Sequence, residues 1–136
     1  MKRQEIYKEI ENLLGIVPTK YKNMPDRYLE AELMLMKNKT REESPIPEKY
    51  RELIGLAVAA VINCKYCNFY HSEKAKMHGV TKEEIEDALQ LVKSTVGWSS
   101  YLNGSQMDFD LFKKEMWKSF DYQEQNKFIR GARKAA

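Results

Sequence analysis

The chain has 136 residues, of which 43% are hydrophobic and 32% charged, and its four prolines and six glycines exclude a linker-rich chain. The net charge of +3 is small and both signs are mixed along the chain, which argues against nucleic-acid binding. No apolar run approaches the roughly 20 residues of a membrane span, and the N-terminus lacks the apolar core of a secretory signal. We expect one domain over residues 1–136, in the cytoplasm, with neither nucleic acid nor membrane as partner.

Apolar residues at helical spacing predict a first helix over residues 2–14, with Gly15 in the position of a left-handed C-terminal cap. Residues 16–24 are expected to form a connector or a short turn of helix. Pro25 suits the first turn of a second helix, which ends near Asn38. The residues expected to face the core from these helices are Ile6, Ile10, Leu13, Leu14, Tyr28, Leu29, Leu33 and Met36.

A loop is predicted over residues 38–46, and Pro47 then opens a third helix. This helix has a wide apolar face and several small residues that allow another helix to pack closely. It is expected to end at about residues 62–64, with Asn63 as the N-cap of a fourth helix. The apolar face contains Tyr50, Leu53, Ile54, Ala57, Val58 and Val61, and the small residues are Gly55, Ala57, Ala59 and Ala60.

The fourth helix is predicted over residues 64–78, and Gly79 is its stop. A fifth helix follows at once, because Thr81 and Glu84 have the spacing of a capping box. Its core stripe recurs at helical spacing, and the helix is expected to end near Gly104. The stripe contains Ile85, Ala88, Leu89, Val92 and Val96.

Asp108 is expected to cap a sixth helix, and residues 122–136 are expected to form a separate short helix. No segment has the alternating pattern of a strand. We therefore predict an all-α fold of about six to seven helices. The apolar stripes are wide for so small a chain, so part of this surface is expected to be buried between subunits.

The two cysteines, Cys64 and Cys67, stand three residues apart, and His71 follows one helical turn later. Residues three and four apart are neighbours on a helix, so Cys67 is within reach of both others, and two cysteines one turn apart can form a disulfide. At a helix N-terminus, free N–H groups and the dipole stabilise a thiolate, and His71 can accept its proton. In a reducing compartment such a pair indicates a catalytic, redox-active or metal-binding site rather than a structural disulfide.

Glu52 can join this group only if the chain turns back at Asn63. In one unbroken helix Glu52 would lie about 18 Å from Cys64, too far for a shared site. If the two helices pack as an antiparallel pair, Glu52 and His71 stand at comparable distances from the turn and face each other. This arrangement would place a glutamate, a histidine and two cysteines in one pocket.

The motif of Glu52, Cys64-x-x-Cys67 and His71 resembles the signature of the AhpD-like alkylhydroperoxidases within the carboxymuconolactone decarboxylase family. The similarity continues through Gly79-Val80-Thr81-x-x-Glu84-Ile85-x-x-Ala88-Leu89. The resemblance implies an all-helical fold with a central antiparallel helix pair, and a homo-oligomer, commonly a trimer or hexamer. It also implies a thiol-dependent peroxidase or disulfide reductase, a peroxiredoxin-type oxidoreductase for antioxidant defence. Such an enzyme reduces hydroperoxides at the expense of a dithiol reductant, with no cofactor and no metal.

In the mechanism implied by this family, Glu52 acts through water and His71 to deprotonate Cys67. Cys67 attacks the peroxide, and Cys64 resolves the sulfenic acid as an intramolecular disulfide. Helix-terminus electrostatics alone favours Cys64 as the more acidic thiol, so the reverse order stays open. Tyr66 stands where the best-known alkylhydroperoxidases have a histidine. It can support the site by donating a hydrogen bond, but it is no base at neutral pH.

The sequence allows four other interpretations. The cysteines could be inert core residues, since buried cysteine behaves as a small apolar side chain. A zinc site of Cys64, Cys67, His71 and His78 is disfavoured, because His78 would lie about 21 Å from Cys64 along the helix axis. His78 is expected instead to interact with the helix C-terminus. A decarboxylase-like small-molecule enzyme and a non-enzymatic helical interaction protein are the remaining alternatives.

Overall fold

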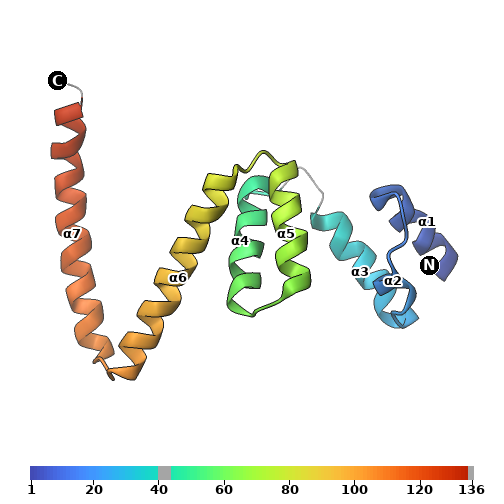
Figure 1. Cartoon of the computed structure of the whole chain (residues 1–136), viewed down its shortest axis with the longest axis horizontal. Coiled ribbons are helices and arrows are strands. Elements are labelled where there is room, and N and C mark those ends of the chain that lie inside the picture. Colours follow the sequence, from blue (N-terminus) through green and yellow to red (C-terminus); the bar gives the residue numbers. More distant parts are fainter. Residues whose placement is uncertain (40–43, 135–136) are drawn as a thin grey trace. The chain divides into compact units, whose positions relative to one another are not determined.

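The computed structural model describes residues 1–39 and 44–134, and in that part the chain forms seven helices and no strand (Figure 1). The prediction of an all-α fold is confirmed. The helices fall into two compact units, Met1–Pro47 and Glu48–Ala136. The first contains α1 (Arg3–Leu14), α2 (Thr19–Lys22) and α3 (Asp26–Lys39), and the second contains α4 (Glu48–Val61), α5 (Lys65–Met77), α6 (Lys82–Gly104) and α7 (Phe109–Lys134). A single domain over residues 1–136 stays a prediction.

The first unit is built around a small core in which α1 packs against α3. Its buried residues recur four apart on each of the two helices, which is the spacing of one helix face. They are Ile6 and Ile10 of α1 and Leu29 and Leu33 of α3, joined by Tyr21 of α2. Gly15 ends α1 in the left-handed conformation with φ of 76°, as its position in the sequence predicts.

Three residues predicted to face this core are exposed, namely Leu13, Leu14 and Tyr28. Tyr28 directly precedes the buried Leu29, and consecutive residues of a helix point about 100° apart. Leu13 and Leu14 lie in the last turn of α1, beyond the buried pair of that helix. The periodicity therefore identified the helices but overestimated how much of each helix is buried.

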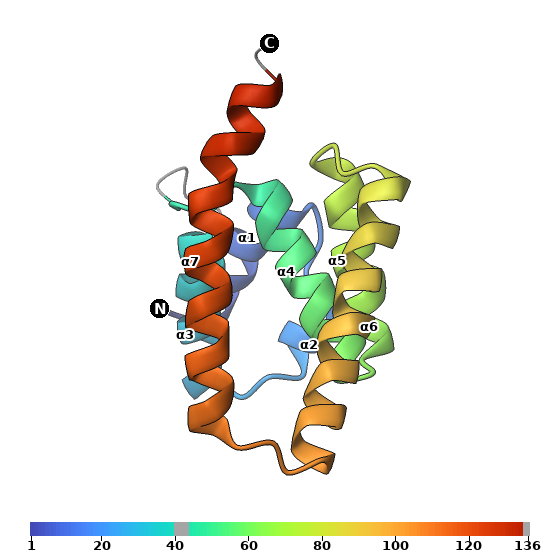
Figure 2. The ribbon, with the colours of Figure 1, turned by 90° about the vertical axis from the view of Figure 1, so that its left-hand side faces the viewer.

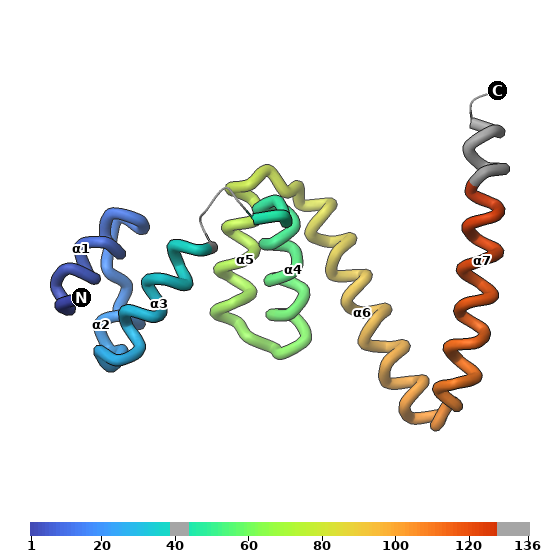
Figure 3. Tube along the Cα trace, turned by 180° about the vertical axis from the view of Figure 1, so that it is seen from behind, coloured from blue at the N-terminus to red at the C-terminus, as the bar shows by residue number. Residues whose placement is uncertain are grey.

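In the second unit, α4 and α5 lie side by side and run antiparallel (Figure 3). Small side chains let the two helices approach, and Ala59 of α4 and Ala75 of α5 are both buried. The α6 helix also packs against α4. Lys49 of α4 forms an ion pair of 2.5 Å with Glu84 in the first turn of α6. The α4–α5 pair is the frame that carries the predicted site.

The turn between α4 and α5 differs from the prediction, because Asn63 does not cap α5. Asn63 has a φ of 54° and ends α4 in the left-handed conformation, which asparagine tolerates better than most residues. The N–H of Cys64 bonds to the carbonyl of Ala59 (3.0 Å) and that of Asn63 to Ala60 (3.4 Å), as in a Schellman motif. The N-cap of α5 is Cys64 itself.

The α5 helix ends and the α6 helix begins as the sequence predicts. Gly79 follows the C-cap His78 with φ of 78°. The Thr81 hydroxyl accepts a hydrogen bond from the N–H of Glu84 (3.1 Å), and the Glu84 carboxylate accepts one from the N–H of Thr81 (2.8 Å). The predicted capping box is confirmed.

The C-terminal part of the chain departs from the prediction of two helices, because α7 is one continuous helix from Phe109 to Lys134. No glycine or proline interrupts residues 109–130, so nothing in the sequence breaks the helix near residue 122. Asp108 does cap it, since its carboxylate accepts the N–H of Leu111 (2.6 Å). Figure 2 shows α6 and α7 joined at one end by residues 105–108. Residues 40–43 of the predicted loop and 135–136 of the predicted last helix lie outside the described residues.

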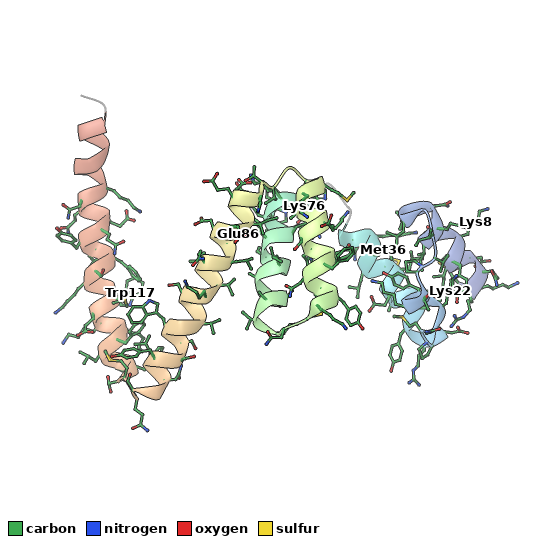
Figure 4. The ribbon with its side chains drawn as sticks, viewed as in Figure 1. Lys8, Lys22, Met36, Lys76, Glu86 and Trp117 are labelled. Carbon is green, nitrogen blue, oxygen red and sulfur yellow. A yellow bond between two sulfur atoms is a disulfide. The ribbon has the colours of Figure 1, made fainter. Side chains whose placement is uncertain are left out.

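A large apolar surface of the second unit is uncovered. Tyr50, Ile54, Val58 and Val61, predicted to face a core, are each more than half exposed. On α7, Trp117 projects from the side that faces α6 and is 66% exposed (Figure 4). Within the described ranges, no helix is long and apolar enough to cross a membrane.

Candidate active site

The two cysteines occupy the first turn of α5 and are joined by a disulfide. Their Cα atoms are 5.3 Å apart, which is within the range that a disulfide spans. The sulfur of Cys64 accepts a hydrogen bond of 3.2 Å from the N–H of Cys67. Cys64 therefore does at this N-terminus what serine or aspartate commonly does, with a sulfur atom in place of oxygen. A thiolate on Cys64 would receive the same hydrogen bond.

Glu52 and His71 are in direct contact across the α4–α5 interface. Oε2 of Glu52 lies 2.7 Å from Nδ1 of His71. The Glu52 side chain is only 10% exposed and that of His71 is 28% exposed. A carboxylate can only accept, so Nδ1 carries the proton and Nε2 is the nitrogen that can take one from another group. Buried carboxylates are costly unless paired, and this contact provides the partner.

The imidazole of His71 lies against the backbone of α4 at Gly55. A Cβ atom added to Gly55 would overlap with the Nδ1, Cε1 and Nε2 atoms of the ring. The rings of His71 and Tyr70 are nearly perpendicular to each other, with 5.1 Å between their centroids. The ring is thus held by a hydrogen bond, a backbone surface and an aromatic edge.

Tyr66 does not lie in this packed group. It is 76% exposed, and the ammonium of Lys65 sits 5.2 Å from the centroid of its ring. Tyr70 is the tyrosine whose ring contacts His71, and it was not among the predicted site residues. Its only signal in the sequence was its position next to His71, which does not distinguish a contact residue from a surface aromatic.

His78 is close to the glutamates of α4, a proximity between helices that distance along α5 does not reveal. Nε2 of His78 lies 4.0 Å from Glu48, and this nitrogen is buried with no hydrogen-bond partner among the described residues. Among those residues, Glu48, Glu52 and His78 are the group whose ligand atoms could share a metal ion, within 4.8 Å of one another. However, Glu52 already holds His71, and Glu48 is paired with Arg51 at 3.0 Å.

The arrangement has the parts of an activated thiol site. A carboxylate fixes a histidine so that one ring nitrogen is free to accept a proton. The histidine stands one helical turn beyond a cysteine whose sulfur is bonded to a second sulfur. Such a group can cycle between a dithiol and a disulfide, with the histidine taking and returning the proton.

Comparisons with known proteins agree with this architecture. The model of the carboxymuconolactone decarboxylase family matches residues 28–106. The fold is similar to that in a crystal structure of the alkylhydroperoxidase AhpD core from Rhodospirillum rubrum ATCC 11170, with a TM-score of 0.67. The two share 21% sequence identity, and the match covers 78% of this chain and 81% of that one. No curated protein matches the sequence.

Proposed function

This chain belongs to the carboxymuconolactone decarboxylase family. We propose that it is a thiol-dependent peroxidase or disulfide reductase of the alkylhydroperoxidase kind. The observation that carries the proposal is the contact of 2.7 Å between Glu52 and His71, one turn beyond the linked cysteines. A buried carboxylate behind a histidine is what a proton acceptor for a thiol requires. An inert cysteine pair has no need of it.

In the proposed cycle, Nε2 of His71 accepts the proton of the Cys67 thiol, while Glu52 keeps the proton of Nδ1 in place. The thiolate attacks the outer peroxide oxygen, so the O–O bond breaks and an S–O bond forms. The departing alkoxide takes the proton from His71 and leaves as an alcohol. The Cys67 sulfur is thereby oxidised to a sulfenic acid.

Cys64 then closes the cycle. Its thiol attacks the sulfenic sulfur of Cys67, which forms the S–S bond and releases water. An external dithiol reduces this disulfide by thiol–disulfide exchange and is itself oxidised to a disulfide. We place this cycle in a reducing compartment, the cytoplasm, where such a reductant is present.

We assign the attack to Cys67 because it lies in α5 one turn before His71. The hydrogen bond from the N–H of Cys67 to the sulfur of Cys64 instead favours Cys64 as the attacking residue, since it stabilises a thiolate on Cys64. A resolving thiol also needs to ionise, so this bond serves the second step. Tyr66 has no assigned part in either step.

We also propose that the protein works as a homo-oligomer. A groove of about 710 Å³ runs between α4 and α6 and is lined mainly by apolar side chains. Tyr50, Ile54, Val58, Val61, Leu91 and Val96 line it, and each is at least 43% exposed in one chain. Apolar patches of this kind mark interfaces between protein chains. A second copy of the chain is the occupant that we propose.

Peroxide turnover with a panel of dithiol reductants tests the proposed activity. Wild-type protein is expected to consume an organic hydroperoxide with at least one of the dithiols, and Cys67→Ser to lose this turnover. The matched control is Ser72→Ala, which changes a hydroxyl on α5 without touching the cysteines. Turnover that survives Cys67→Ser would show that this thiol does not attack the peroxide.

A further inference from the structure

We infer that Gly55 is a positioning residue for His71. The lack of a side chain at this place in α4 lets the imidazole lie on the helix backbone, where Nδ1 meets Glu52. The inference rests on the proposed function, because it concerns the histidine that would accept the thiol proton. It assigns a task to a residue that touches neither the cysteines nor a substrate.

The steric requirement at Gly55 is specific to this glycine. A Cβ there would overlap with three atoms of the His71 ring, all on the edge that holds both nitrogens. At Gly97, also inside a helix, a Cβ would meet nothing within 4 Å. Gly15 and Gly79 have positive φ angles, so they are needed for their backbone conformation. Gly55 has no such angle and is needed for the space that it leaves.

That space determines where the ring nitrogens are. Glu52 and Gly55 are three residues apart on α4, so they are neighbours on the helix face that packs against α5. The ring fills the place at Gly55, and Nδ1 is then 2.7 Å from the Glu52 carboxylate. A hydrogen bond is lost once its atoms separate beyond about 3.5 Å. A displacement of about 1 Å, forced by one methyl group, therefore releases His71 from Glu52.

The protein can accommodate that methyl group without unfolding. His71 is 28% exposed on its side chain, so the ring can move outward toward solvent. Gly55→Ala is therefore expected to leave the helices intact while it frees Nδ1 and changes the direction of Nε2. An alanine also suits a helix interior better than a glycine does.

The test compares Gly55→Ala with Gly97→Ala, which gains the same helix propensity but meets no neighbour. The first readout is the ¹⁵N signal of the His71 imidazole, which reports the hydrogen bond at Nδ1 in the absence of any reaction. The second is the pH dependence of thiol alkylation in the reduced protein. Gly55→Ala is expected to lose the Nδ1 signature and to alkylate about 10²-fold more slowly at neutral pH. Gly97→Ala is expected to match the wild type in both.

A double variant separates positioning from a general structural effect. In the His71→Gln background, Gly55→Ala is expected to cause no further loss of alkylation rate, because the two residues act through one contact. A further loss there, or an unchanged Nδ1 signal in Gly55→Ala, would overturn the inference. If Gly55→Ala alone fails to fold, the double variant Gly55→Ala/His71→Ala is expected to fold, because removal of the imidazole leaves room for the new methyl group. Failure of that pair to fold would also overturn it.

A different variant, His71→Gln, tests the proposed function. If His71→Gln alkylates at the wild-type rate at every pH, then His71 does not activate a thiol and the proposed function fails. The ¹⁵N signal of Gly55→Ala still decides whether this glycine positions the ring.

Discussion

The carboxylate of Glu52 and the imidazole of His71 are 2.7 Å apart although the two residues are 19 positions apart in the sequence. They come from different helices, and the left-handed Asn63 is the residue that turns one helix back along the other. The contact fixes the orientation of the imidazole and leaves Nε2 as the nitrogen that can accept a proton.

Removal of the Glu52 charge is expected to slow ionisation of the attacking thiol. Glu52→Gln keeps the size of the side chain but removes the carboxylate charge beside the ring that takes the thiol proton, so alkylation of the reduced protein at neutral pH should fall by about 10²-fold. The rate of iodoacetamide alkylation between pH 5 and 10 checks this. The control is Glu73→Gln, an exposed α5 residue paired with Lys76 at 2.6 Å.

Replacement of Cys64 should distinguish its role as the N-cap of α5 from its role in the redox cycle. Serine is a favoured N-cap residue and alanine is not, so the reduced Cys64→Ala protein should be about 1 kcal/mol less stable than Cys64→Ser. Both variants lose the disulfide equally. Urea unfolding under reducing conditions measures the difference. Equal stability of the two variants would show that the side chain at position 64 does not act as a cap of α5.

The groove between α4 and α6 should be covered in solution. Val58→Glu places a charge on a residue that is 54% exposed in one chain and lines this groove. It should shift the protein toward smaller assemblies, because an unpaired charge is costly in a buried interface. Light scattering during size-exclusion chromatography measures the mass. The matched control is Glu86→Gln on α6, and a monomeric wild type would contradict the expectation.

The pair that ties α4 to α6 should weaken in acid. The hydrogen bond from Lys49, followed by that from the N–H of Thr81, holds the pKa of Glu84 below its usual value of 4.5. Because this pKa is lowered on folding, the ionised Glu84 stabilises the folded protein above about pH 4.5. This stabilisation is lost as the pH falls through the pKa of Glu84 in the folded protein. Glu84→Gln should therefore be less stable than the wild type at pH 7, with a difference that shrinks toward pH 3. Thermal unfolding of both proteins, with Glu83→Gln as control, measures this.

Local signals in the sequence located most helix ends correctly. Gly15, Gly79 and the Thr81–Glu84 capping box each involve only residues within one turn, so the sequence contains all that decides them. The contact between Glu52 and His71 was also predictable, because the two residues stand at comparable distances from the turn of an antiparallel helix pair. These features follow from spacing in the sequence.

Other features depended on contacts that spacing does not contain. Asparagine is common both as an N-cap and in the left-handed conformation, and Asn63 adopts the second because its N–H and that of Cys64 close the end of α4. The proximity of His78 to Glu48 arises between helices, so distance along α5 could not reveal it. The exposed face of α4 is as apolar as a buried face and has the same helical periodicity. The sequence pattern therefore could not tell that this face is exposed.

The reaction of the reduced protein with one equivalent of an organic hydroperoxide is the most direct test of the proposed peroxidase cycle. Intact-mass spectrometry and peptide mapping would follow the two thiols. We predict consumption of the peroxide and a loss of two hydrogens from the protein, with one intramolecular Cys64–Cys67 disulfide, and a much slower reaction in Glu52→Gln. Two thiols that stay reduced while the peroxide persists would contradict the account.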